Sequence, residues 1–355
     1  MATGAVFERT MRSVTNPTLV EVTRGGRVES DHRGAIAICD TGGALKSAWG
    51  DVETPVFARS AFKSLQALPL VETGAANAFS VTDEELALAC ASHSGEAMHT
   101  ERVQAWLRRL DCADHDLACG PHAPFHEPTS KDMVRNGLEP CRVHNNCSGK
   151  HTGFLTLARH LKAPIQAYEN PQHPVQKLVR QAIAEMCGTA PDSMPIGIDG
   201  CAAPNYALPL KNLALAMAKM GTRAGLSADR ANAASRLMQA WRKHPRLMSG
   251  TGRACGDLIE ASNGTTVVKT GAEAVFLASI PEQGLGIALK IDDGGTRAAE
   301  TAMARILVLL GAADASNPLI AKHMNPSIKN WRGDLVGERR TSPALATLGL
   351  FNGLD

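Results

Sequence analysis

Short runs of β-branched and apolar residues, separated by glycine-containing turns, fill the first fifty positions of the chain. Residues 18–22 are followed by Gly25-Gly26, and residues 35–39 and 44–49 are separated by Thr41-Gly42-Gly43. Apolar runs that alternate with such turns are typical of antiparallel strands. The same pattern returns at residues 265–269, 274–278 and 286–291. Both ends of the chain therefore predict strands.

The segment between these regions, from about residue 60 to about residue 247, has the spacing of helices. The Thr-Asp-Glu-Glu run at 82–85 is a capping box ahead of an apolar stretch. Pro174 and Gly188 bracket a second helix, and Ser227 caps a third that reaches Trp241. A further helix is predicted over 296–310, ended by Gly311. The last forty residues, rich in Pro, Gly and Asn, are predicted to be mostly loop.

Strands at both ends with helices between them predict one sheet that the two ends of the chain close together. The fold class is therefore α+β or mixed α/β, with an antiparallel sheet. We expect residues 1–355 to form a single catalytic unit. Its sheet subdomain spans about 1–59 and 250–355, and its helical subdomain spans about 60–249.

Composition and charge exclude several classes of protein. Hydrophobic residues make up 44% and charged residues 20% of 355 positions, which is ordinary globular usage. Lys and Arg number 37 against 35 Asp and Glu, so no charge excess indicates nucleic-acid or membrane partners. The sequence contains no run of about 18 apolar residues that could span a membrane, and no signal peptide is visible. We therefore expect a cytoplasmic protein.

The nine cysteines are an odd number in a long chain, which does not indicate a disulfide framework. In a reducing compartment most cysteines are small buried hydrophobes, and a few are metal ligands or nucleophiles. Position in the sequence, rather than the count, has to separate these roles.

Two short motifs point to serine chemistry. Ser60 and Lys63 form the one Ser-x-x-Lys of the chain, and on a helix the amine can reach the hydroxyl and act as its base. Lys269-Thr270-Gly271 ends a predicted strand, which is the context of this motif in serine penicillin-recognising enzymes. Such enzymes carry a third hydroxyl element between the two motifs. Ser92, His93 and Ser94 are open candidates for it.

The run at 144–153, His-Asn-Asn-Cys-Ser-Gly-Lys-His-Thr-Gly, is the densest in reactive residues. Cys147 with a nearby histidine, joined by Cys201, could bind a metal, although the spacing is not one of the strong Cys-x-x-Cys forms. A phosphate-binding loop is excluded because position 145 is Asn where that motif needs Gly. A looser cluster of His and Cys over 112–126 matches no standard metal motif and is more typical of polar surface.

Four segments together resemble the asparaginase II family, the rhizobial-type or class 3 L-asparaginases. They are Ser-Ala-Phe-Lys at 60–63, Ala-Ser-His-Ser-Gly-Glu at 91–96, Asn-Cys-Ser-Gly-Lys-His at 146–151 and Gly-Ile-Asp-Gly-Cys at 197–201. The resemblance covers essentially the whole chain. It implies a fold related to serine β-lactamases and glutaminases, a homodimer, and hydrolysis of L-asparagine to L-aspartate and ammonia.

The resemblance also implies roles for single residues. Ser60 resembles the family nucleophile with Lys63 as its base, and Ser92 resembles a second serine paired with Lys269. The resemblance further implies a zinc (Zn²⁺) site with water as its fourth ligand, and positions that hold the charged groups of the substrate. The zinc ligands would be Cys147, Lys150 and Cys201, and the substrate-binding residues would be Arg59, His151 and Asp199.

The expected reaction proceeds through an acyl-enzyme, and which of the two serines attacks is open. A mechanism in which zinc makes a hydroxide nucleophile is the rival. Two different functions also fit these residues. One is that of a related serine amidohydrolase, such as a glutaminase or a β-lactamase-like hydrolase, and the other is that of a zinc- or thiol-responsive binding protein without catalysis.

Overall fold

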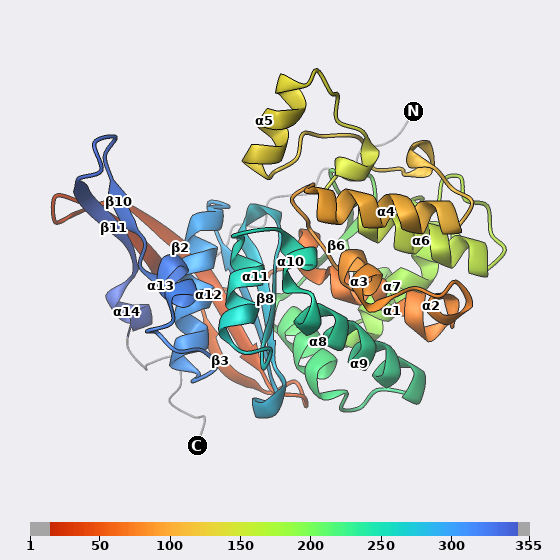
Figure 1. Cartoon of the computed structure of the whole chain (residues 1–355). Helices are drawn as coiled ribbons and strands as arrows, with labels where there is room; N and C mark the ends of the chain where they lie inside the picture. The colour runs from red at the N-terminus through yellow and green to blue at the C-terminus, as the bar shows by residue number, and fades with distance from the viewer. Residues whose placement is uncertain (1–14, 347–355) are drawn as a thin grey trace, which may run out of the picture.

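The computed structural model describes residues 15–346, whose strands form two antiparallel sheets (Figure 1). Among these residues the larger sheet has eight strands in the order β10-β11-β1-β2-β9-β8-β7, with β3 also paired to β2. Its strands are β1 (Thr18–Arg24), β2 (Arg27–Cys39), β3 (Leu45–Trp49), β7 (Val267–Thr270), β8 (Val275–Ile280), β9 (Leu285–Ile291), β10 (Ser327–Lys329) and β11 (Leu335–Thr341). The smaller sheet has the order β4-β6-β5, from β4 (Val56–Phe57), β5 (Ile196–Ile198) and β6 (Pro204–Leu208).

The larger sheet is built from the two ends of the described chain. Val20 of β1 pairs with Thr341 of β11, and Ile36 of β2 pairs with Leu289 of β9, both in antiparallel register. Every helix from α1 to α11 lies between β4 and β7 in the sequence. The predicted fold class, a mixed α/β fold with an antiparallel sheet from N- and C-terminal segments and inserted helices, is confirmed.

The helices begin and end where the sequence provides caps. Thr82 and Glu85 form the complete capping box of α3, Gly188 takes a left-handed conformation after α7, and the Ser227 hydroxyl caps α9. The helices are α1 (Lys63–Glu72), α2 (Ala75–Ala78), α3 (Asp83–Ala89), α4 (Ala97–Arg109), α5 (Glu127–Arg135), α6 (Ser148–His160), α7 (Pro174–Cys187), α8 (Leu210–Thr222), α9 (Ala228–Lys243), α10 (Pro245–Ser249), α11 (Ala254–Ala261), α12 (Thr296–Leu309), α13 (Pro318–Met324) and α14 (Pro343–Ala346).

Helices cover both faces of the central strands. α8 packs against β2, β8 and β9, while α12 packs against β1, β8, β9 and β11. In β9 consecutive residues from Leu285 to Leu289 are all buried, although neighbours in a strand point to opposite faces. The apolar core therefore continues through the sheet instead of lying on one side of it.

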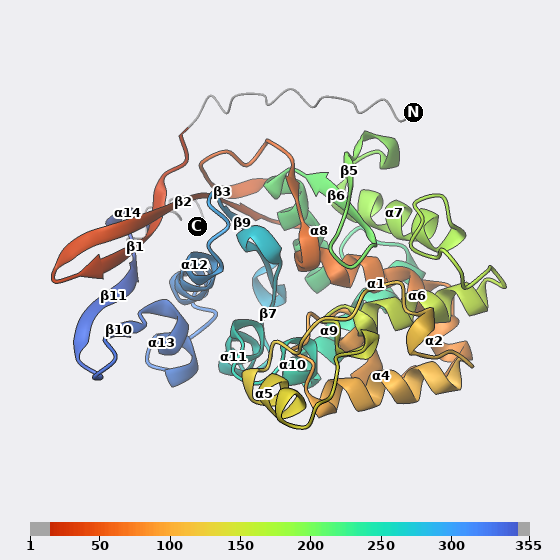
Figure 2. The same ribbon diagram turned by 90° about the horizontal axis from the view of Figure 1, so that it is seen from above.

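The edge strand β7 lies where the sheet meets the helical part of the molecule (Figure 2). It contacts a short 3₁₀ turn, η1 (Arg59–Phe62), which directly precedes α1. This edge brings Lys269 and Ser60, which are far apart in the sequence, to one place. Within residues 15–346, no helix is long and apolar enough to cross a membrane.

Two expectations about local structure were wrong. The run expected at 35–39 is only the end of a longer strand, β2, which begins at Arg27. The C-terminal segment expected to be mostly loop contains α13, β10, β11 and α14. β11 is half-buried and carries Glu338, Arg339 and Arg340, so it lacks the apolar alternation that reveals strands. The predicted subdomain limits stay a prediction, and their parts at 1–14 and 347–355 lie outside the described residues.

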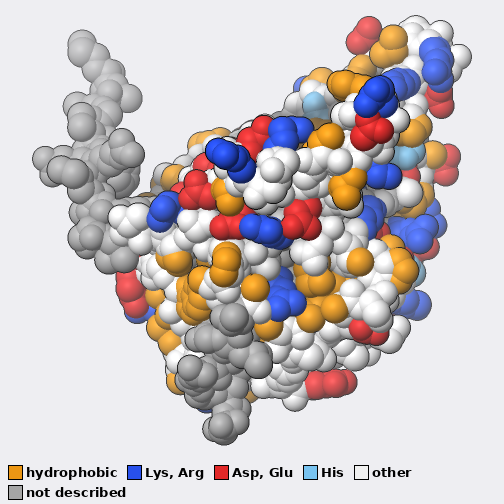
Figure 3. Space-filling view, turned by 90° about the vertical axis from the view of Figure 1, so that its left-hand side faces the viewer, with side chains coloured by type: hydrophobic (Ala, Val, Ile, Leu, Met, Phe, Trp, Pro, Cys, Tyr) orange, Lys and Arg blue, Asp and Glu red, His pale blue; other side chains and the backbone are white. Residues whose placement is uncertain are grey.

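Ion pairs between neighbouring strands lie on the exposed surface of β1, β2 and β11. Arg340 of β11 bonds Glu21 of β1 at 3.1 Å, and Arg24 bonds Glu29 across the β1–β2 turn at 2.8 Å. Figure 3 looks onto this side of the molecule, where acidic and basic side chains are interspersed. Exposed pairs of this kind add little stability, but they keep a sheet face compatible with water.

Candidate functional site

Ser60 lies in a tight connection between strand and helix. β4 leads into η1, and α1 begins at Lys63, so Ser60 sits one 3₁₀ turn before the helix. Gly271, just after β7, packs so closely on this turn that an added Cβ would lie 2.9 Å from the Ala58 carbonyl oxygen and the Ala61 nitrogen. A glycine at the end of β7 therefore lets the strand that carries Lys269 touch the turn that carries Ser60.

The Ser92 hydroxyl joins the two lysines predicted from sequence. Its Oγ lies 3.0 Å from Lys63 Nζ and 2.8 Å from Lys269 Nζ. Lys63 also donates to the carbonyls of Ala91 (2.6 Å) and Asn146 (3.5 Å). Among the described residues, no hydrogen bond joins Lys63 to Ser60, which is half-buried, whereas Ser92 and both lysines are buried.

Burial changes the acid strength of Lys269. Burial is the main cause that lowers the pKa of the Lys269 amine to about 7. Cys255 acts to raise this pKa, and the positive charge of Lys63 lowers it further. The Lys269 amine donates to the Thr270 carbonyl at 2.6 Å, and the Thr270 N–H donates to Cys255 Sγ at 3.2 Å. Near neutral pH this lysine therefore can both accept and release a proton.

The structure separates the three candidates for the third hydroxyl element. His93 has both ring nitrogens engaged, Nδ1 by the Gly95 N–H (3.2 Å) and Nε2 by Ser148 Oγ (2.9 Å). Ser94 donates to Glu96 Oε1 at 2.6 Å. Ser92 is the one of the three whose side chain hydrogen-bonds the two lysines.

Glu96, whose role sequence reasoning missed, holds the segment that carries Ser92. Besides Ser94, its carboxylate accepts from the Thr251 N–H at 2.9 Å and from the Thr251 hydroxyl at 2.7 Å. Gly250 permits this contact, because an added Cβ would lie 1.9 Å from Ser94 Oγ and its φ is +109°. The Gly-Thr-Gly run at 250–252 is the one signal that could have indicated a close approach.

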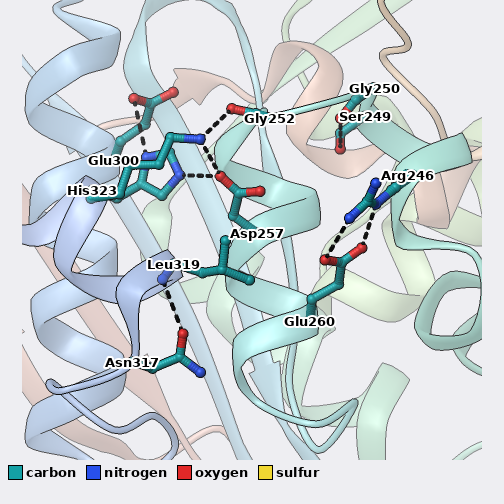
Figure 4. A network of polar contacts seen from close by, with 11 residues as sticks. Arg246, Ser249, Gly250, Gly252, Asp257, Glu260, Glu300, Asn317, Leu319 and His323 are labelled. Atoms are coloured by element: carbon teal, nitrogen blue, oxygen red, sulfur yellow. Dashed lines mark hydrogen bonds and ion pairs between the residues drawn. The ribbon is translucent and has the colours of Figure 1, made fainter.

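A polar network behind this loop ties it to the C-terminal helices (Figure 4). Lys322 of α13 donates to the Gly252 carbonyl at 3.0 Å and to Asp257 of α11 at 2.7 Å. His323 lies 2.8 Å from the same Asp257 oxygen and 3.9 Å from Glu300 of α12. Burial acts to raise the pKa of Asp257, but the hydrogen bonds and charges of His323 and Lys322 outweigh it and lower that pKa.

The residues expected to bind zinc lie together. Cys147 directly precedes α6 and Lys150 lies one turn into it, so the two side chains share a face. Lys150 Nζ lies 3.0 Å from Cys201 Sγ, and all three side chains are buried. A hydrogen bond from Cys147 lowers the pKa of Cys201, with Lys150 acting in the same direction.

The donor set of this cluster fits zinc, since thiolates and a nitrogen are ligands that this metal accepts. His151, next to Lys150, is fully buried; the Tyr168 hydroxyl lies 2.7 Å from its Nδ1, and the ring also interacts with the Cys201 thiol. In residues 15–346 no group of three or more His, Cys, Asp and Glu side chains could hold a metal.

The residues expected to hold the charges of the substrate form two groups. Arg59 Nε donates to Asp199 Oδ1 at 2.8 Å, and the Arg59 N–H donates to Asn205 Oδ1 at 3.1 Å. Asp199 follows β5 and Asn205 lies on β6, so the smaller sheet positions both partners. His151 belongs instead to the thiol cluster, where burial lowers its pKa.

Three solved structures show what the chain is similar to. A β-lactamase from Mycobacterium bovis is 15% identical with a TM-score of 0.41, covering 79% of this chain and 95% of its own. A protein called Mglu is 18% identical with a TM-score of 0.36, covering 84% and 72%. A mutant simvastatin synthase, LovD, from Aspergillus terreus is 10% identical with a TM-score of 0.31, covering 73% and 86%.

No curated protein matches the sequence closely enough to count as a relative. A family model does match, and it spans residues 20–341, which include every predicted site residue. The match supports an amidohydrolase with a small amide as its substrate. The chain belongs to the L-asparaginase II family.

Proposed function

We propose that the protein is an L-asparaginase that hydrolyses L-asparagine to L-aspartate and ammonia through a serine acyl-enzyme. The observation that carries the proposal is the Ser92 hydroxyl between two buried lysine amines, at 3.0 and 2.8 Å. A hydroxyl between two amines is a path along which a proton can move. Membership of the L-asparaginase II family supports the choice of substrate.

Ser60 is the better nucleophile of the two serines because a substrate must reach the attacking oxygen. Ser60 is half-buried, whereas Ser92 is 7% exposed and already bonded to both lysines. In the proposed reaction the Ser60 proton passes to Lys63 while the oxygen attacks the side-chain amide carbon. A proton returned to the amide nitrogen lets ammonia leave, and water then hydrolyses the ester to L-aspartate and free Ser60.

In this proposal, Ser92 and Lys269 relay the proton that Lys63 takes from Ser60. The pKa of Lys269, lowered by burial to about 7, lets this amine share a proton with its neighbours near neutral pH. The positive charge of Lys63 acts, after burial, to lower the pKa of Lys269 further. Backbone N–H groups near Ser60 would stabilise the oxyanion that forms on attack.

Cys147, Lys150 and Cys201 would hold zinc, as the contact of Lys150 with Cys201 and the burial of all three residues support. When bound, zinc would supply a fixed positive charge that anchors the substrate and the surrounding loops. Arg59 would bind a carboxylate of the substrate, and Asp199 would hold the Arg59 guanidinium in place.

Ammonia release by the purified protein is the primary test, with L-asparagine, L-glutamine and a chromogenic β-lactam as substrates. We expect L-asparagine to be the preferred substrate and Ser60→Ala to lose at least about a thousandfold in kcat. The control is Ser193→Ala, which changes an exposed serine. Trapping of an aspartyl adduct on a Ser60 peptide by mass spectrometry would separate the two serines.

The zinc site is tested separately by metal content. We expect about one zinc per chain and loss of that metal in Cys201→Ser. If Ser60→Ala keeps most of its activity while a chelator abolishes it, the serine mechanism is wrong. If no amide is hydrolysed but zinc is bound, a thiol-responsive binding protein becomes the better interpretation.

We also propose a homodimer. Light scattering coupled to gel filtration would then give about twice the chain mass of 37.5 kDa. A monomer at micromolar concentration would contradict this proposal.

A further inference from the structure

A cavity of about 460 Å³ opens beside the turn that carries Ser60. Phe57 and Ile198 give it an apolar side, while Arg59, Asn205, Glu273 and Lys290 give it a polar side. Arg59, which lines this cavity, directly precedes Ser60 in the turn η1. Charges of both signs on one wall suit a ligand that is itself zwitterionic.

Arg59 has two carboxylates beside it, and only one of them faces the cavity. Asp199 Oδ1 accepts from Arg59 Nε at 2.8 Å and from the Gly200 N–H at 2.9 Å, and its side chain is 12% exposed. Glu273 Oε1 lies 4.0 Å from Arg59 NH1, and its side chain is 67% exposed. Asp199 therefore holds the Arg59 guanidinium in place. Glu273 adds an exposed negative charge near the same guanidinium, 4.0 Å from it.

The backbone holds Glu273 in this place. Arg59, Glu273 and Ala274 have φ of 52°, 58° and 55°, in the left-handed region that residues other than glycine seldom adopt. Glu273 follows β7 by three residues, and the packing of Gly271 on the Ser60 turn fixes the distance between the two segments. Unfavourable backbone conformations of this kind cluster at functional sites, where the surrounding structure maintains them.

We propose that Glu273 determines specificity by binding the α-ammonium group of the substrate, while Arg59 binds its α-carboxylate. The inference rests on the proposed hydrolysis of a small amide at Ser60 and narrows its substrate class to free α-amino acid amides. Amides without the α-ammonium group, or with that group acylated, leave the Glu273 carboxylate unpaired and are poor substrates.

The competing explanation is that Glu273 only balances the charge of Arg59. Lys290 also lines the cavity and donates to the Ile291 carbonyl, so the wall already holds a second cation. The two explanations differ in one measurable quantity, the ratio of kcat/KM for L-asparagine to kcat/KM for succinamate. Succinamate is L-asparagine with hydrogen in place of the α-ammonium group.

The test begins with the wild-type protein. A hydrogen bond to a charged group contributes roughly ten- to a hundredfold in binding, so we expect L-asparagine to exceed succinamate by at least tenfold in kcat/KM. The kcat/KM for Nα-acetyl-L-asparagine should be as low as that for succinamate. Equal turnover of L-asparagine and succinamate would overturn the inference while leaving the proposed hydrolysis intact.

Three variants then assign the effect to one carboxylate. Glu273→Gln should reduce the asparagine-to-succinamate ratio at least tenfold, and Glu273→Asp, which keeps the charge, should restore part of it. Glu282→Gln, an exposed residue at the opposite end of β8, is the control and should keep the wild-type ratio. An unchanged ratio in Glu273→Gln that is folded by circular dichroism would overturn the inference.

A binding measurement keeps the inference testable if no amide is hydrolysed. Titration calorimetry of the wild-type protein with L-aspartate and with succinate compares the same carboxylates with and without the α-ammonium group. Tighter binding of L-aspartate by at least tenfold, lost in Glu273→Gln, supports the inference even where the proposed hydrolysis fails. Equal binding of the two dicarboxylates overturns it.

Discussion

Replacing Lys269 with methionine should change how the stability of the protein depends on pH. The folded chain holds this amine with a pKa of about 7, lowered by burial from an ordinary value of 10.5. Because the amine binds its proton more weakly when folded, the unfolded state carries more protons between these two pH values. Stability must therefore rise with pH across that window and level off above it.

The size of the effect follows from the two pKa values. The difference between 10.5 and about 7, at 1.36 kcal/mol for each pKa unit, corresponds to about 5 kcal/mol over the whole window. Between pH 7 and pH 9 this single group should add about 2 kcal/mol to the free energy of unfolding. Methionine has similar length and no titratable group, so Lys269→Met should lack that part of the slope.

Urea unfolding at pH 7, 8 and 9 measures the slope, with the fluorescence of the buried Trp106 and Trp241 as the signal. Lost hydrogen bonds to Ser92 and Thr270 shift the whole curve of the variant, so the difference in slope is the diagnostic quantity. Lys177→Met, which removes an exposed lysine from α7, is the matched control and should follow the wild type. Parallel curves for wild type and Lys269→Met would refute a buried, weakly basic lysine.

Three further changes test other parts of the molecule. Gly250→Ala would put a Cβ 1.9 Å from Ser94 Oγ at a φ of +109°, so we expect a loss of more than about 2 kcal/mol in thermal unfolding; an unchanged melting temperature would contradict the packing. Asp257→Asn removes a carboxylate whose pKa is lowered by His323 and Lys322. The variant should therefore lose less stability than wild type as pH falls below about 4, measured by urea unfolding; an identical dependence of stability on pH in this range would contradict the Asp257–His323 interaction. Thr82→Ala should cost about 1 kcal/mol by urea unfolding, because it removes the cap of α3, and no loss would mean that the cap is dispensable.

The parts of the fold that follow from local chemistry could be predicted from the sequence. The cap at Ser227 and the left-handed Gly188 mark helix ends because each satisfies backbone groups within a few residues. β11 could not be predicted, since a half-exposed strand with consecutive charged residues is defined by its pairing with β1. Such pairing depends on residues more than three hundred positions away.

The candidate site divides in the same way. Ser60, Lys63 and Lys269 belong to short motifs whose residue types indicate their chemistry. The choice of Ser92 over its neighbours, and the contact of Glu96 with Thr251, needed three dimensions because each partner comes from a distant segment. Resemblance to a known family supplied Lys150 as a candidate ligand, which spacing rules for cysteine and histidine do not include.

A sheet closed by both ends of the chain has a consequence for the order in which a ribosome releases this protein. When the helices up to α11 have left the ribosome, β2 cannot yet pair with β9, and β1 cannot yet pair with β11. The apolar faces of these strands therefore stay exposed until the C-terminal strands have been synthesised. Lys269 likewise meets Ser92 only after β7 has been synthesised. The contact of Lys269 with Ser92 therefore forms late in translation, and the need for chaperones should be greatest just before the last strands appear.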